Sequence, residues 1–83
     1  MMHSIMSFDE TIECARERAL PPPEVRRFIR EQSWLYQSDV AAALGVDQSM
    51  VSRWETGASE PRGAMRERYR RLLQQLQREV LAS

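Results

Sequence analysis

The sequence has little of the chemistry from which metal sites and active sites are built. Its 83 residues include one cysteine, Cys14, and one histidine, His3. One cysteine cannot form an internal disulfide, and one Cys with one His falls short of the four nitrogen or sulfur ligands of a structural zinc site. The chain has no Gly-rich phosphate loop, and no nucleophile and base stand at a recognisable spacing. We therefore expect no metal, no cofactor and no enzymatic activity, and we interpret Cys14 and His3 as incidental.

Long apolar runs are also missing. No run approaches the roughly 18 residues that cross a bilayer as a helix. The beginning of the chain carries Asp9, Glu10 and Glu13, where a signal peptide would have an apolar core. We therefore expect no membrane partner and a cytoplasmic location. The length of the chain corresponds to about one small domain.

Lysine is absent, so all twelve basic side chains are arginine, and twelve acidic side chains bring the net charge to zero. A neutral total argues against a nucleic-acid-binding domain, which is usually basic. However, the two parts of the chain carry opposite net charges. Residues 1–24 carry two arginines against five acids, a balance of −3, and residues 25–83 carry ten against seven, a balance of +3. Arginine is the side chain that forks onto phosphate and guanine, although GC-rich codon usage also explains a lysine-free sequence.

Apolar residues spaced at three and four, with caps and breakers between them, predict five helices. Ser7 and Glu10 form a capping box before the first helix, the prolines at 21–23 end it, and the glycines at 45 and 57 end the third and fourth. Asp47 is placed to cap the fourth. The predicted helices cover residues 8–20, 23–32, 37–44, 48–55 and 61–81. No alternating β-branched run predicts a strand, so the expected fold class is all-α, with an appended element at 1–22 and a domain at 23–83.

The segment from Gln37 to Thr56 is predicted to form two helices joined by a tight turn. Gly45 allows the chain to reverse, and Val51 and Trp54 share the face that anchors the second helix to the core. The opposite face carries four side chains that can hydrogen-bond: Gln48, Ser49, Ser52 and Arg53. A helix held by one face, with polar groups on the other, is what the major groove of DNA accepts.

This segment resembles the helix-turn-helix domain of the phage repressor and Cro family. The small residue, turn glycine, apolar anchors and helix ending stand at the family's spacing: Ala41, Gly45, Val46, Val51, Trp54, Glu55 and Gly57. The resemblance covers about residues 24–76. It implies a lambda-repressor-like helix-turn-helix domain, to which residues 8–20 add an extra N-terminal helix.

The resemblance also implies roles for individual residues. The side chains expected to contact DNA are Gln37, Gln48, Ser49, Met50, Ser52, Arg53, Thr56 and Arg62. Met50 lies at the edge of the outward face, where packing against the core is the alternative. Arg30 and Glu55 match positions that form a bracing ion pair. Two positions depart from the family: Trp34 stands where a small residue, often Gly, is common, and Tyr36 stands where Ser or Thr usually caps the helix.

The last predicted helix carries a longer apolar stripe than one small domain needs. We expect the residues near its end, Leu72, Leu73, Leu76 and Val80, to contribute to a homodimer that matches a two-fold operator. The alternative is that the stripe covers the N-terminal helix of the same chain.

Together these patterns favour a sequence-specific transcriptional regulator of double-stranded DNA, specifically a small phage- or prophage-type repressor. Two alternatives stay open. An antitoxin of a toxin–antitoxin pair would use the same fold and hold its protein partner through the acidic N-terminal helix. A protein-interaction module would keep the fold without DNA binding, in keeping with the neutral charge.

Overall fold

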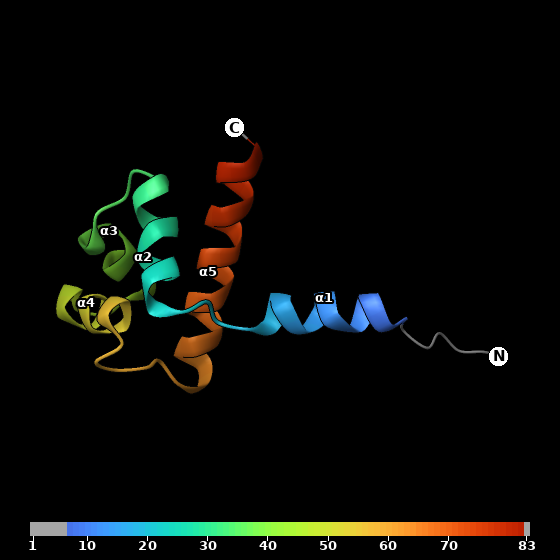
Figure 1. The fold of residues 1–83 in the computed structure, drawn as a ribbon. Helices are drawn as coiled ribbons and strands as arrows, with labels where there is room; N and C mark the ends of the chain where they lie inside the picture. Colours follow the sequence, from blue (N-terminus) through green and yellow to red (C-terminus); the bar gives the residue numbers. More distant parts are fainter. Residues whose placement is uncertain (1–6, 83) are drawn as a thin grey trace.

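The computed structural model describes residues 7–82, with the backbone alone at positions 13, 14 and 16–18. Within this range the chain forms five helices and no strand, which confirms the predicted all-α class. The helices are α1 (Phe8–Arg18), α2 (Pro23–Gln32), α3 (Gln37–Leu44), α4 (Gln48–Thr56) and α5 (Gly63–Ala82). Helices α2 to α5 pack together, whereas α1 projects outward from the start of α2 (Figure 1). His3 and the side chain of Cys14 lie outside the described residues.

The predicted capping box at the start of α1 is confirmed. The Ser7 hydroxyl accepts the Glu10 backbone N–H at 3.1 Å, and the Glu10 carboxylate accepts the Ser7 N–H at 3.2 Å. The bond from the Ser7 backbone N–H to the carboxylate, with a smaller contribution from the Ser7 side chain, favours the ionised form, so the pKa of Glu10 is lowered. The helix ends at Arg18, two residues before the predicted end, and the chain then passes through the three prolines into α2.

The turn between α3 and α4 is formed as predicted, but one of its caps is not. Gly45 takes a left-handed φ of 72°, and the N–H of Val46 bonds the carbonyl of Ala41 at 3.0 Å. Asp47 occupies the position before α4, yet its side chain makes no capping hydrogen bond. The prediction for its side chain is therefore wrong, and the backbone carbonyl of Asp47 accepts the Met50 N–H instead.

Helix α5 begins two residues later than the predicted start at Pro61. Gly63 has a φ of 59°, which a right-handed helix cannot carry in its interior. The helix therefore starts at Gly63, and Pro61 lies buried in the preceding loop.

The core lies where α2, α3, α4 and α5 meet. Its buried apolar side chains are Ile29, Val40, Ala41, Leu44, Val51, Trp54, Tyr69 and Leu73. The rings of Trp54 and Tyr69 pack with centroids 4.8 Å apart, tilted by 33°. Trp54 is therefore a core residue and leaves no indole face for stacking on a base.

The apolar stripe of α5 divides along the helix. Tyr69 and Leu73 are in the core, Leu72 and Leu76 pack against it half-buried, and Leu81 is 79% exposed near the C-terminal end. The stripe does not cover the beginning of α1, where Phe8 is 81% exposed. The intramolecular alternative is thus not what the structure shows.

Candidate nucleic-acid interface

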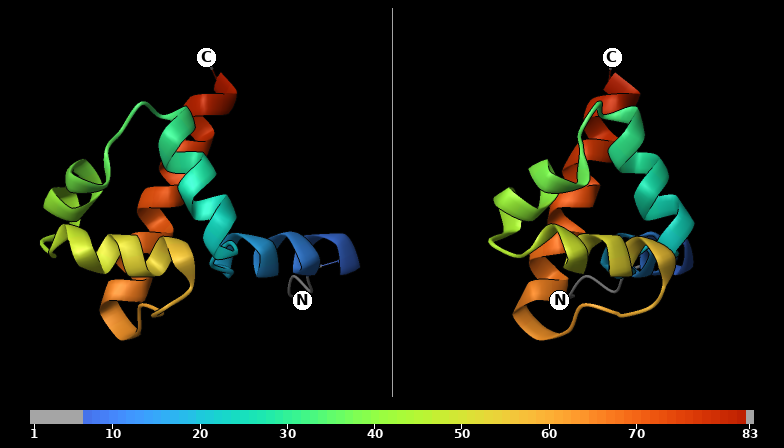
Figure 2. Two further views of the ribbon diagram at one scale, coloured as in Figure 1. Left: turned by 60° about the vertical axis from the view of Figure 1, so that its left-hand side comes forward. Right: turned by 90° about the vertical axis from the view of Figure 1, so that its left-hand side faces the viewer.

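Helices α3 and α4 lie together on one side of the molecule, and α1 extends from the opposite side (Figures 1 and 2). Val51 and Trp54 bury one face of α4 against the core. The other face presents the side chains expected to meet DNA: Gln48, Ser49 and Arg53 are exposed and Ser52 is partly exposed. The structure thus brings four of the predicted contact residues onto a single outward surface.

Glu55 extends from the inner side of α4 and is paired with a buried arginine of α2. Arg30 donates to its two carboxylate oxygens at 2.6 and 3.0 Å, and a third bond, at 2.8 Å, goes to the Leu35 carbonyl. The predicted bracing pair is therefore present. The bonds to Glu55 raise the pKa of Arg30 above its ordinary value, despite the opposing effect of burial. Since a buried charge is costly unless it is paired and hydrogen-bonded, this contact holds α4 at one fixed place against α2.

Gln37 connects this buried pair to the outward surface. Its amide nitrogen donates to Glu55 at 3.0 Å, and its amide oxygen accepts from the Gln48 amide nitrogen at 3.4 Å. A chain of hydrogen bonds thus runs from Arg30 through Glu55 and Gln37 to Gln48. We call it the glutamine relay. It assigns the Gln37 amide orientation, because the nitrogen must face the carboxylate.

A second buried arginine was not found by reasoning from the sequence. Arg26 lies one helical turn before Arg30 and donates to the carbonyls of Pro21 at 2.6 Å and Trp54 at 2.9 Å. It also bonds both carboxylate oxygens of Glu60, at 2.8 and 3.0 Å, and this lowers the pKa of Glu60. The available signal was its spacing of four from Arg30 on the face that holds Ile29. Arg26 ties the proline segment, the end of α4 and the α4–α5 loop together.

The remaining predicted contacts fall on or near the α4 surface. Met50 is half-buried against the core, in a hollow shared with Val46 and Trp54, so it packs as the alternative interpretation has it. The Thr56 hydroxyl donates to the Arg53 carbonyl at 3.2 Å at the end of the helix. Arg62 is exposed in the loop that follows.

The loop between α2 and α3 contains both departures from the family pattern, Trp34 and Tyr36. Trp34 has a φ of 61°, a region in which glycine is unstrained, and its side chain is 93% exposed. The structure thus shows why a glycine suits this position. At Tyr36 the start of α3 is capped by a side chain from inside the helix. The Asp39 carboxylate accepts the Tyr36 backbone N–H at 2.7 Å.

A short helix anchored on its inner face and polar on its outer face, supported by a second helix across a tight turn, is the arrangement of the helix-turn-helix class of DNA-binding domains. The model of the helix-turn-helix family matches residues 27–75, more than half of the chain. The protein belongs to this family, of the phage repressor and Cro type, and carries the domain of DNA-binding transcriptional regulators. No curated protein and no solved structure matches the chain. None of the helices in residues 7–82 is long and apolar enough to cross a membrane.

Proposed function

We propose that the protein is a sequence-specific regulator of the phage- or prophage-repressor type, which binds a two-fold DNA operator with α4 in the major groove. The observation that carries this proposal is the glutamine relay. A surface amide held through a second glutamine by a buried ion pair is poised in one orientation before any ligand arrives. Such pre-organisation lowers the entropic cost of binding.

The relay also indicates which base Gln48 reads. One amide N–H is given to Gln37, so the carbonyl oxygen and the second N–H are left to face the groove. Adenine presents a donor and an acceptor in the matching order, at N6 and N7. The exposed guanidinium of Arg53 matches the two acceptors of guanine. The proposed half-site therefore contains an adenine under Gln48 and a guanine under Arg53.

The distribution of charge supports DNA binding despite the neutral total. The acidic α1 extends from the side opposite α3 and α4 (Figure 2). The DNA phosphates would meet Arg62, which is exposed in the loop after α4, while Arg53 faces a base. Since charges more than about 10 Å apart are largely screened at physiological salt, the acids of α1 oppose this contact only weakly.

We propose that the protein binds as a homodimer, with half-sites about one helical turn, roughly 34 Å, apart. Of the four residues expected at the dimer contact, Leu73 is in the core of its own domain and Leu72 and Leu76 pack against that core. The surface left for a partner lies further along α5, around Val80 and Leu81.

Selection of bound sequences from a random DNA pool tests the proposal directly. The expected result is a two-fold consensus with adenine and guanine at two fixed positions of each half. Arg53→Ala should weaken binding by roughly 1–3 kcal/mol and relax the preference at the guanine alone. The matched control is Arg27→Ala, which removes an exposed arginine from α2 and should alter neither the affinity for DNA nor the base preference. A pool that yields no consensus would contradict the proposal.

A protein-interaction module that does not bind DNA is the second candidate, favoured by the 81% exposure of Phe8 on the acidic α1. Salt dependence separates the two readings. A DNA-binding domain loses duplex affinity steeply as salt rises, with a slope that reports the phosphates contacted. Absence of duplex binding even at low salt would favour the interaction module.

A further inference from the structure

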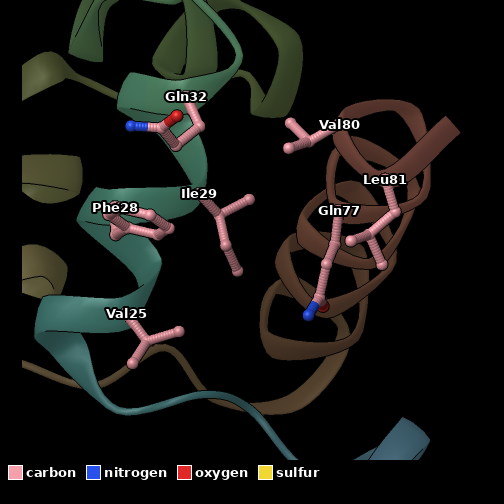
Figure 3. Close-up of a pocket in the computed structure, with 7 residues that line it drawn as sticks. All are labelled: Val25, Phe28, Ile29, Gln32, Gln77, Val80 and Leu81. Atoms are coloured by element: carbon pink, nitrogen blue, oxygen red, sulfur yellow. The ribbon is translucent and has the colours of Figure 1, made fainter. Parts of the chain in front are cut away.

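An apolar groove runs between α2 and the C-terminal half of α5, away from the α4 surface. Side chains from both helices line it, chiefly Val25, Phe28 and Ile29 from α2 and Val80 and Leu81 from α5 (Figure 3). Its volume is about 220 Å³. Phe28 is more than half exposed, and Leu81 is 79% exposed. Exposed apolar side chains gathered in one concave place mark a binding surface.

Helix α1 has an apolar face that is exposed to solvent. Phe8 and Ile12, four residues apart, share one side of the helix and are both exposed. The helix has 11 residues, whereas isolated helices shorter than roughly 12–15 residues are only marginally stable in water. Its capping box stabilises the first turn, but a stable α1 needs an apolar surface to cover it.

The exit from the proline segment directs α1 away from its own groove. Leu20 packs against the core, and the Pro21 carbonyl accepts from Arg26 at 2.6 Å. The prolines at 21–23 restrict the backbone between this anchor and α2. Helix α1 therefore leaves the base of the domain pointing outward (Figure 2), and a groove within its reach must belong to another chain.

Charge favours the pairing of α1 with the domain of a second chain. Asp9 and Glu10 follow Phe8 directly and are exposed. On α5, Arg78 follows Gln77 of the groove and lines a polar hollow on the adjoining side of the helix together with Glu79. Arg71 lies two turns earlier in the same hollow, where it also pairs with Glu67 at 3.0 Å. The acids of α1 would meet these arginines when its apolar face enters the groove. The net charge of −3 on residues 1–24 of one copy would then lie against the net charge of +3 on residues 25–83 of the other.

We propose that α1 of each chain packs into the α2–α5 groove of a second copy, and that this reciprocal exchange forms the homodimer. Each chain holds one helix and one groove, so two chains satisfy both contacts and close a two-fold dimer. The inference rests on the homodimer of the proposed function and names its contact. The apolar faces of α1 and of the groove are covered together, and α4 of each chain stays free for DNA.

The test places a charge on either side of the contact. Ile12→Glu alters the helix and Phe28→Glu alters the groove; both side chains are exposed, so each variant should keep the helical content of the parent. Sedimentation equilibrium at micromolar concentration should show a dimer for the parent chain. Each variant should raise the dimer dissociation constant by at least about tenfold, because a carboxylate enters an apolar contact. Tyr36→Ser, which removes an exposed side chain outside the groove, should remain dimeric.

Mixing the two variants gives the decisive result. The intact α1 of the Phe28→Glu chain fits the intact groove of the Ile12→Glu chain, so an equimolar mixture should form dimers that neither variant forms alone. A monomeric parent chain, a dimeric Ile12→Glu variant or a mixture that stays monomeric would each overturn the proposal. The DNA selection experiment is independent of this outcome. If the dimer contact is wrong, a monomer can still select a half-site from the DNA pool. If DNA binding is wrong, the chains can still form the α1-linked dimer without selecting any sequence.

Discussion

Two arginines of α2, Arg26 and Arg30, lie one helical turn apart and are both buried, yet they connect different parts of the molecule. Each donates from two guanidinium nitrogens to the two oxygens of a carboxylate, and each also donates to a backbone carbonyl. The partner of Arg30 is Glu55, whose side chain is 2% exposed; the partner of Arg26 is Glu60, whose side chain is 48% exposed. Only Glu55 continues through Gln37 to the outward surface of α4.

The environment of the partner carboxylate decides what a buried arginine does. Water can replace much of the Glu60 contact, because that carboxylate is half in solvent. Water cannot easily reach Glu55, so the Arg30 pair sets the position of α4 and with it the Gln48 amide. The same residue type therefore anchors a loop in one place and positions the outward surface of α4 in the other.

Loss of charge at the two carboxylates should give the largest difference. Glu55→Gln leaves Arg30 buried without a counter-charge, and should lower the free energy of unfolding by about 3–5 kcal/mol. Glu60→Gln is the matched control and should cost clearly less, because water reaches this half-exposed position and Arg26 keeps its bonds to the Pro21 and Trp54 carbonyls. Urea denaturation followed by circular dichroism measures both. Equal losses would refute the distinction between a buried and an exposed partner.

Removal of the connecting glutamine tests whether the Arg30 pair extends to the DNA surface. Gln48→Ala should remove roughly 1–3 kcal/mol of preference for adenine at its base. Gln37→Ala should remove part of the same preference, because the Gln48 amide is then free to turn over. Glu60→Gln should leave base preference unchanged. Competition binding with substituted operators measures these effects, and an unaltered preference in Gln37→Ala would disprove the relay.

Acid should weaken the Arg26 contact. The bonds from Arg26 lower the pKa of Glu60 from its ordinary value of 4.5. The unfolded chain therefore takes up the proton first as pH falls, so this stabilisation is complete above about pH 4.5 and is lost below it. Arg70 likewise lowers the pKa of Glu67, to about 2, and stability should continue to fall toward that pH. Thermal unfolding across this range should show a shallower decline in Glu60→Gln than in the parent; an identical decline would show that Glu60 does not contribute.

The smallest effect is expected at Tyr69, whose hydroxyl is within electrostatic reach of both arginines. The hydroxyl is buried and has no hydrogen-bond partner among the described residues, and burial raises the pKa of Tyr69. Tyr69→Phe should therefore change the free energy of unfolding by less than about 1 kcal/mol, or raise it slightly, because an unsatisfied buried hydroxyl is costly. A clearly larger loss of stability would indicate a hydrogen bond that links the two buried pairs.

Much of the fold could be predicted because its signals are local. The capping box at Ser7, the turn at Gly45 and the apolar spacing around Trp54 act through residues three or four positions away, and each is present in the structure. The Arg30–Glu55 pair is not local, and only the family resemblance pointed to it. The start of α5 was misplaced, because the left-handed φ of Gly63 depends on how the loop is held and not on its composition.

The five helices, the turn between α3 and α4, and the polar side chains on one face of α4 follow from the amino-acid sequence, since periodicity and chain breakers act over a few residues. The burial of Arg26 and Arg30, the carboxylate that each one meets, and the link from Glu55 through Gln37 to Gln48 emerge only from the packed helices. The packing also divides the stripe of α5 into a core part and an open groove. These features depend on how helices distant in the sequence cross, because burial and pairing are set by neighbours from other elements.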